Sequence, residues 1–147
     1  MVYQWKMSGL HKVSAQTAGE VCEKLDAEGK LTAEALVEAS RPEDAPLHNE
    51  FEWNDSIAAG EWRKQQARMI INALVVCATP SAEPVRAYFK VSATPKYESL
   101  QTIITTPDKY SQLLKQALGE LAAFQRKYRS LKELDPVFAA FEQLRIA

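Results

Sequence analysis

The stretch "LVVCATPSAEPVRAYFKVSA", residues 74–93, decides the fold class of this 147-residue chain. It begins with a β-branched apolar run, passes through the turn "PSAEP" and ends in a run in which residue character alternates with period two. Two short runs of this kind around a proline-containing turn are typical of a β-hairpin. The hairpin places strands between two helical parts of the chain.

Alternation in the second run predicts two different faces of the strand. The apolar face would consist of Val85, Ala87, Phe89 and Val91. The opposite face, basic and aromatic, would consist of Arg86, Tyr88 and Lys90. A third run, "ESLQTIITT" (98–106), lies between the turn-like "TPK" and "TPD", and we expect it to complete a three-stranded antiparallel sheet.

Upstream of the hairpin, the pattern is helical. Ser14 is placed to cap a first helix that closes at Gly29, and Thr32 to cap a second that ends before Pro42. These two helices form a helical corner. A long central helix should then start at Asp55 or Ser56 and run to about Ala73. Its inward stripe is predicted to consist of Ala58, Trp62, Met69 and Ala73, flanked by Gln66 and Ile70, with Trp62 as the anchor.

Downstream, Thr106 and Pro107 mark the start of a long C-terminal helix. Its apolar residues succeed one another at spacings of four and three, a heptad pattern. They are Tyr110, Leu114, Ala117, Leu121, Phe124, Tyr128 and Leu131. This seam requires an apolar partner: we favour packing across the sheet, and the alternative is a helix shared with another subunit. A short helix, "PVFAAFEQLRI", follows. The sequence thus predicts one α+β domain over residues 1–147.

Composition places the chain among globular proteins, with 46% hydrophobic and 25% charged residues. Residues 1–55 hold five Lys/Arg against eleven Asp/Glu, and residues 56–147 hold thirteen against eight, so the molecule should be dipolar. No signal peptide or membrane span is indicated, and we expect a cytoplasmic protein. Cys22 and Cys77 lack zinc-site spacing and are interpreted as buried free thiols.

The segment "PLHNEFEWND", residues 46–55, is called the HNEFEW segment below. It has three interpretations: a metal site, a partner-binding surface or a packed loop. If extended, His48, Glu50 and Glu52 would share one face near Asp55, but three donors along one strand lie too far apart for a single ion. We favour packing, with Phe51 and Trp53 filling the gap between the helical corner and the central helix.

No motif for catalysis is present. The chain has two histidines, neither beside a nucleophile, and five glycines with no phosphate-binding loop among them. We therefore expect no enzyme, no cofactor and no metal.

Nucleic-acid binding is the function that the sequence favours most. The candidate contacts are Lys64, Arg68, Arg86, Tyr88 and Lys90, with Tyr88 stacking on a base or sugar. A second basic group, Arg126, Lys127, Arg129 and Lys132, follows near the end of the long C-terminal helix. The alternative explanation of these basic residues is structural. Cations are favoured at the C-terminal end of a helix, and alternating charge is ordinary on a solvent-exposed strand. The alternative function is a protein-interaction or self-assembly module that uses the heptad seam or the HNEFEW segment.

The chain resembles a family of small bacteriophage- and prophage-encoded proteins with the core "LT...LVE.A...APLH..FEW.D..AA...R..QAR". Residues that match this core include Leu31, Thr32, Leu36, Val37, Pro46, Leu47, His48, Phe51, Glu52, Trp53, Asp55, Ala58, Ala59, Arg63, Gln66, Ala67 and Arg68. Gly60 departs from it, since the family more often has a better helix former there. The resemblance implies a phage or prophage setting in a host bacterial cell and a non-enzymatic accessory role, with DNA, a phage or host protein, or itself as partner.

Overall fold

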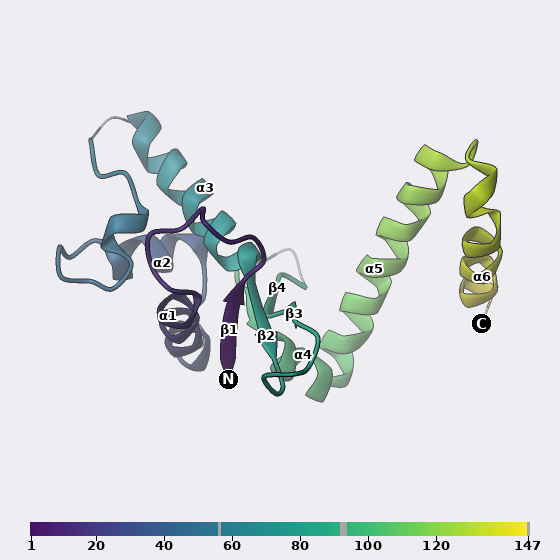
Figure 1. Cartoon of the computed structure of the whole chain (residues 1–147), viewed down its shortest axis with the longest axis horizontal. Coiled ribbons are helices and arrows are strands. Elements are labelled where there is room, and N and C mark those ends of the chain that lie inside the picture. The colour runs from purple at the N-terminus through teal and green to yellow at the C-terminus, as the bar shows by residue number, and fades with distance from the viewer. Residues whose placement is uncertain (56, 92–93, 147) are drawn as a thin grey trace. The chain divides into compact units, whose positions relative to one another are not determined.

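The computed structural model describes residues 1–55, 57–91 and 94–146, and the chain divides into two compact units, Met1–Ile103 and Ile104–Ala147. The first unit contains the strands together with three of the longer helices, and the second contains the long C-terminal helix and the last helix (Figure 1). The predicted α+β class is confirmed by the helices and the three-stranded antiparallel sheet. That residues 1–147 unfold as one domain stays a prediction.

The helical corner forms as its capping residues predict. Helix α1 spans Ala15–Ala27, and Ser14 Oγ accepts a hydrogen bond from Thr17 N at 3.1 Å. Gly29, at φ +69°, adopts the left-handed conformation that ends the helix. Helix α2 spans Ala33–Ser40, with Thr32 Oγ1 accepting from Ala35 N at 3.0 Å. The two helices therefore start and stop at signals that are local in the sequence.

The central helix α3 spans Ile57–Ala73 and leads directly into strand β2, Leu74–Cys77. The expected cap of α3 falls on Asp55 or Ser56. Ser56 lies outside the described residues, and the Asp55 carboxylate accepts a hydrogen bond from Arg63. The hairpin is confirmed: β2 pairs antiparallel with β3, Val85–Arg86, in the register Val75↔Arg86 and Val76↔Val85.

The third strand of the sheet is not the predicted one. It is β1, Val2–Trp5, which pairs antiparallel with β2 in the register Val2↔Cys77 to Trp5↔Leu74 and gives the order β1-β2-β3. Figure 1 shows β1 beside β2, with α1 next to β1. In the run "VYQW" the aromatic residues Tyr3 and Trp5 alternate with Val2 and Gln4, as in a strand. Its partner is distant in the sequence, and no turn signal nearby indicates the pairing.

The expected long strand and the strand at 98–106 are also wrong in extent. The first breaks at Ala87, whose N–H donates to Leu74 O at 3.1 Å. A separate two-stranded sheet then forms from β4, Tyr88–Phe89, and β5, Glu98–Ser99. After β5 the chain turns into helix α4, Leu100–Thr105. The expected strand end at residues 92–93 lies outside the described residues.

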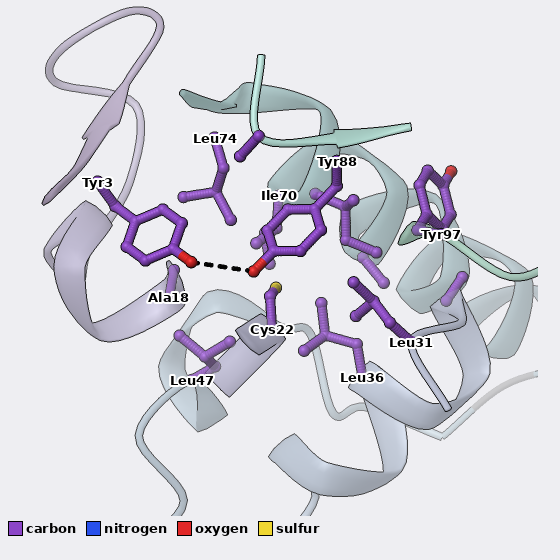
Figure 2. Close-up of a cluster of buried hydrophobic side chains, with 14 of the residues drawn as sticks. Tyr3, Ala18, Cys22, Leu31, Leu36, Leu47, Ile70, Leu74, Tyr88 and Tyr97 are labelled. Atoms are coloured by element: carbon purple, nitrogen blue, oxygen red, sulfur yellow. Dashed lines mark hydrogen bonds between the residues drawn. The ribbon is translucent and has the colours of Figure 1, made fainter. Parts of the chain in front are cut away.

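The hydrophobic core of the first unit is centred on two parallel tyrosines, Tyr3 of β1 and Tyr88 of β4 (Figure 2). Their rings are stacked at 4° with centroids 6.5 Å apart, and their hydroxyls are 3.1 Å apart. Tyr3 Oη also donates to Glu23 Oε2 at 3.3 Å. Burial raises the pKa of Tyr3 to about 12 and raises that of Tyr88 further. Both phenols are therefore neutral hydrogen-bonding groups inside the core.

The second unit is a helical hairpin. Helix α5 spans Pro107–Tyr128, a short 3-10 turn covers Lys132–Leu134, and helix α6 spans Asp135–Ile146. Figure 1 shows α6 folding back along the end of α5. Packing of α5 across the sheet would join the two units and stays a prediction.

Two further expectations bear on the chain as a whole. Among the described residues, no helix is both long and apolar enough to span a membrane. Cys22 and Cys77 are buried free thiols, as expected, and burial raises the pKa of Cys22 to about 12.

Candidate protein-interaction surface

The HNEFEW segment is packed into the first unit. Leu47 and Phe51 are buried, and Trp53 packs against the same core. Trp53 Nε1 donates to His48 O at 2.8 Å, and the two rings are stacked with centroids 5.0 Å apart. His48 is also held by a contact of 3.1 Å between Nδ1 and Ser40 O, at the end of α2. These contacts agree with the packing interpretation of the segment.

Arg63 of α3 binds the HNEFEW segment through two hydrogen bonds. Its side chain is 6% exposed; Nε donates to Glu52 O at 2.6 Å and Nη2 to Asp55 Oδ1 at 2.9 Å. The guanidinium also lies 5.1 Å from the centre of the Trp53 ring. A buried cation is tolerated only when its donors are satisfied, and here the loop supplies a carbonyl, a carboxylate and a ring. Sequence reasoning assigned Arg63 no such role.

The carboxylates of the HNEFEW segment are used for structure. Residues His48–Glu50 form a 3-10 turn instead of an extended run. The Glu50 carboxylate accepts hydrogen bonds from the backbone N–H groups of Lys12 and Val13 and lies 3.2 Å from His11 Nδ1. Within the described part of the chain, no group of three His, Cys, Asp or Glu side chains is gathered as a metal site would require.

Trp62 is not the inward anchor of α3. Its side chain is 50% exposed and that of Met69 is 52% exposed, so the predicted stripe is wrong by about one residue of helix rotation. Among the side chains of α3 that the structure describes, the buried ones are Ala59, Arg63, Ala67, Ile70 and Ile71; the predicted inward position Ala58 lies outside them. The small residues Ala59 and Ala67 on the buried face of α3 allow α2 and α3 to pack closely. In this orientation of α3 the Arg63 guanidinium points toward the HNEFEW segment.

The five candidate nucleic-acid contacts do not form one free basic face. Lys64 Nζ lies 3.2 Å from Glu61 and 3.5 Å from Glu34, and these carboxylates raise its pKa. Arg68 is partly exposed and Lys90 is exposed. Two of the candidate cations thus remain accessible without a described carboxylate partner.

The two strand residues among the candidates are engaged in the fold. Tyr88 is 1% exposed, so its ring offers no face to a base, and this role is corrected. It lies inward because the break at Ala87 reverses the expected alternation. Arg86 is exposed, but Nε donates to Tyr88 O at 2.9 Å and Nη2 donates to Asn72 Oδ1. Arg86 keeps its net charge because neither acceptor is a carboxylate.

An exposed apolar surface with a regular pattern lies on α5. No described residue of this helix is buried. The exposed fractions are 51% for Tyr110, 49% for Leu114, 41% for Leu121 and 44% for Phe124, and Leu131, just beyond the helix, is 47% exposed. Helix α6 covers only the end of this seam, where the Phe124 and Phe138 rings meet edge to face at 6.3 Å.

Searches give this chain no relative from which a function could be transferred. No protein-family model, curated protein or solved structure matches it. The resemblance to bacteriophage and prophage proteins stays a prediction.

Proposed function

We propose that this chain is a self-associating interaction module, in which the apolar seam of α5 pairs with the same seam of a second copy. The exposed heptad seam is the observation that carries this proposal. A seam of spacing four and three is the pattern by which one helix packs against another. The α5–α6 hairpin itself contributes few buried side chains, Phe138 and Phe141 among the described residues, and a small helical unit gains stability by associating.

The gain is large enough for measurable association. Five large apolar side chains, each about half exposed, gain roughly 1 kcal/mol apiece on full burial, or about 10 kcal/mol for two copies. Loss of rigid-body freedom costs at least about 4 kcal/mol. The remaining 6 kcal/mol or so is an upper limit, and it corresponds to a dissociation constant of tens of micromolar at the tightest. We therefore expect a monomer–dimer equilibrium that depends on concentration.

Charged residues beside the seam favour an antiparallel pair. With Leu121 opposite Phe124 of the second copy, Glu120 of each helix faces Lys127 of the other, giving two equivalent attractive pairs. In a parallel pair with Leu121 facing itself, Glu120 would instead face the neutral Gln125. Flanking charges of this kind set helix orientation in coiled coils. In this register the seam positions from Leu114 to Leu131, spaced 3, 4, 3, 4 and 3, match those of the second copy.

Sedimentation velocity of the full chain, over concentrations from tenfold below to tenfold above the expected dissociation constant, tests the proposal. The variant Leu121→Glu should stay monomeric throughout. Ala123→Glu is the matched control, because it adds the same charge to an exposed position on the polar side of the same helix. Circular dichroism should show equal helicity for both variants. A wild-type chain that is monomeric at every concentration would contradict the proposal, as would equal effects of the two substitutions.

Orientation has a separate test. Glu120→Lys or Lys127→Glu alone should weaken association, because each places like charges opposite one another in the antiparallel pair. The double variant should restore it. Failure of the double variant to recover would exclude the antiparallel register.

A further inference from the structure

A cavity of about 450 Å³ opens on the face of the three-stranded sheet that carries Gln4, Val75 and Arg86. The register places Gln4 beside Val75 and Val75 beside Arg86, so these three side chains form a row across the sheet. Its volume falls within the range of small-molecule sites.

Its walls combine cations and amides with apolar surface and contain no carboxylate. Lys6 and Arg86 supply two positive charges, Gln4 and Asn72 supply amide groups, and Val75 and Pro84 supply apolar surface. Trp5 lines the cavity as a neighbour of Gln4 in the strand, while its indole packs against the core, with Nε1 donating to Val13 O and the ring stacked on His11. A wall of this composition attracts a negative group and leaves an apolar area for the rest of a ligand.

The two cations keep their charge available. Arg86 is fixed by neutral acceptors, Tyr88 O and Asn72 Oδ1, with its guanidinium 5.0 Å from the centre of the Phe89 ring. The Lys6 ammonium makes no ion pair within the described parts of the chain, while its backbone N–H is fixed to Ala73 O at 2.9 Å. A fixed guanidinium and an ammonium on the wall of one cavity are a donor set suited to an oxyanion.

From this arrangement we infer that the cavity binds a small organic anion, with a carboxylate or phosphate held by Lys6 and Arg86 and an apolar or aromatic body against Val75 and Pro84. The site lies in the first unit, and it is independent of the self-association through α5. Failure of one proposal would leave the other intact.

Two-dimensional ¹⁵N–¹H NMR of the full chain tests this inference with phenyl phosphate, benzoate and the uncharged phenol as probes. The backbone amides of Gln4, Lys6 and Asn72, residues that line the cavity, are the reporters, and the indole N–H groups of Trp53 and Trp62, which do not line it, are internal controls. Phenyl phosphate or benzoate should shift the Gln4 and Lys6 amides in a saturable way, with a dissociation constant on the order of millimolar. The relative affinity of these two probes distinguishes phosphate from carboxylate.

Lys6→Gln should weaken binding about tenfold, since it removes one charged donor whose side chain makes no ion pair in the fold. Lys30→Gln, which removes an exposed lysine absent from the cavity wall, should leave binding unchanged. Shifts equal for phenol and the anions, no selective shift of the Gln4 and Lys6 amides, or equal affinities of the two variants would overturn the inference. A single-stranded oligonucleotide that shifts the same residues at far lower concentration would also overturn it, and would assign the cavity to a polynucleotide.

Discussion

Substitution of Gly19 by alanine tests the close packing of α1 on β1. Gly19 lies inside α1, where alanine is favoured over glycine by about 1 kcal/mol of helix propensity. Yet an added Cβ would overlap Cγ, Cδ1 and Cδ2 of Tyr3, all well inside the 3.0 Å that real Cβ atoms keep. Propensity and packing therefore predict opposite signs for the same substitution.

The packing effect should prevail. Overpacking of this kind costs about 1–3 kcal/mol, and displacement of the Tyr3 ring also disturbs its hydroxyl contact with Tyr88, worth about 1 kcal/mol. The upper value for overpacking applies because the added Cβ overlaps three ring atoms. With the hydroxyl contact added and the propensity gain subtracted, Gly19→Ala should lower the free energy of unfolding by about 3 kcal/mol.

Urea unfolding followed by circular dichroism measures this change. Gly60→Ala in α3 and Gly119→Ala in α5 are matched controls, because nothing lies within 4 Å of a Cβ built at either position. Both should raise the free energy of unfolding by up to about 1 kcal/mol. In a Tyr3→Ala background the penalty at Gly19 should disappear. A Gly19→Ala chain at least as stable as the wild type would refute the reasoning.

Three other predictions concern Arg63, Tyr3 and Lys90. Arg63→Met should lower the free energy of unfolding, measured in urea, by about 2 kcal/mol, because it leaves Glu52 O without its buried donor. Arg41→Met removes an exposed cation over the same Trp53 ring and should change the free energy of unfolding little. Equal effects of the two substitutions would contradict the assigned role of Arg63. The pKa of Tyr3 is raised by burial from 10.0 to about 12, so its contribution to stability is fully present below pH 10 and should be lost as the pH rises toward 12; Tyr3→Phe should flatten that part of the stability profile, and an unchanged profile would argue against it. If the chain binds nucleic acid, Lys90→Gln should weaken a gel shift and reduce its salt dependence between about 50 and 200 mM, and the absence of any salt-sensitive shift would end that hypothesis.

Local signals in the sequence predicted the helices well. Ser14, Thr32 and Gly29 act within one turn of their own positions, so each cap is decided by near neighbours. The hairpin between β2 and β3 was predictable for the same reason: its turn lies between its strands.

Features that depend on distant partners were not predictable in this way. The strand β1 is short and finds its partner only through the fold. The orientation of α3 was wrong because burial of Arg63 depends on a carbonyl and a carboxylate that the HNEFEW segment supplies. Tyr88 was assigned to the surface by alternation, which fails where the backbone breaks at Ala87. The heptad seam of α5, by contrast, was visible in the sequence because it is periodic within one helix.

The place of β1 has a consequence for how the protein is made. Its ladder joins Val2 to Cys77, so this pairing closes a loop of about seventy residues and should form late in folding. During synthesis β1 leaves the ribosome well before its partner β2. Its backbone hydrogen-bonding groups have no strand partner until β2 has also been synthesised. Translation that stalls before residue 74 would release a chain with an open strand edge, and such nascent fragments are the species most prone to aggregate.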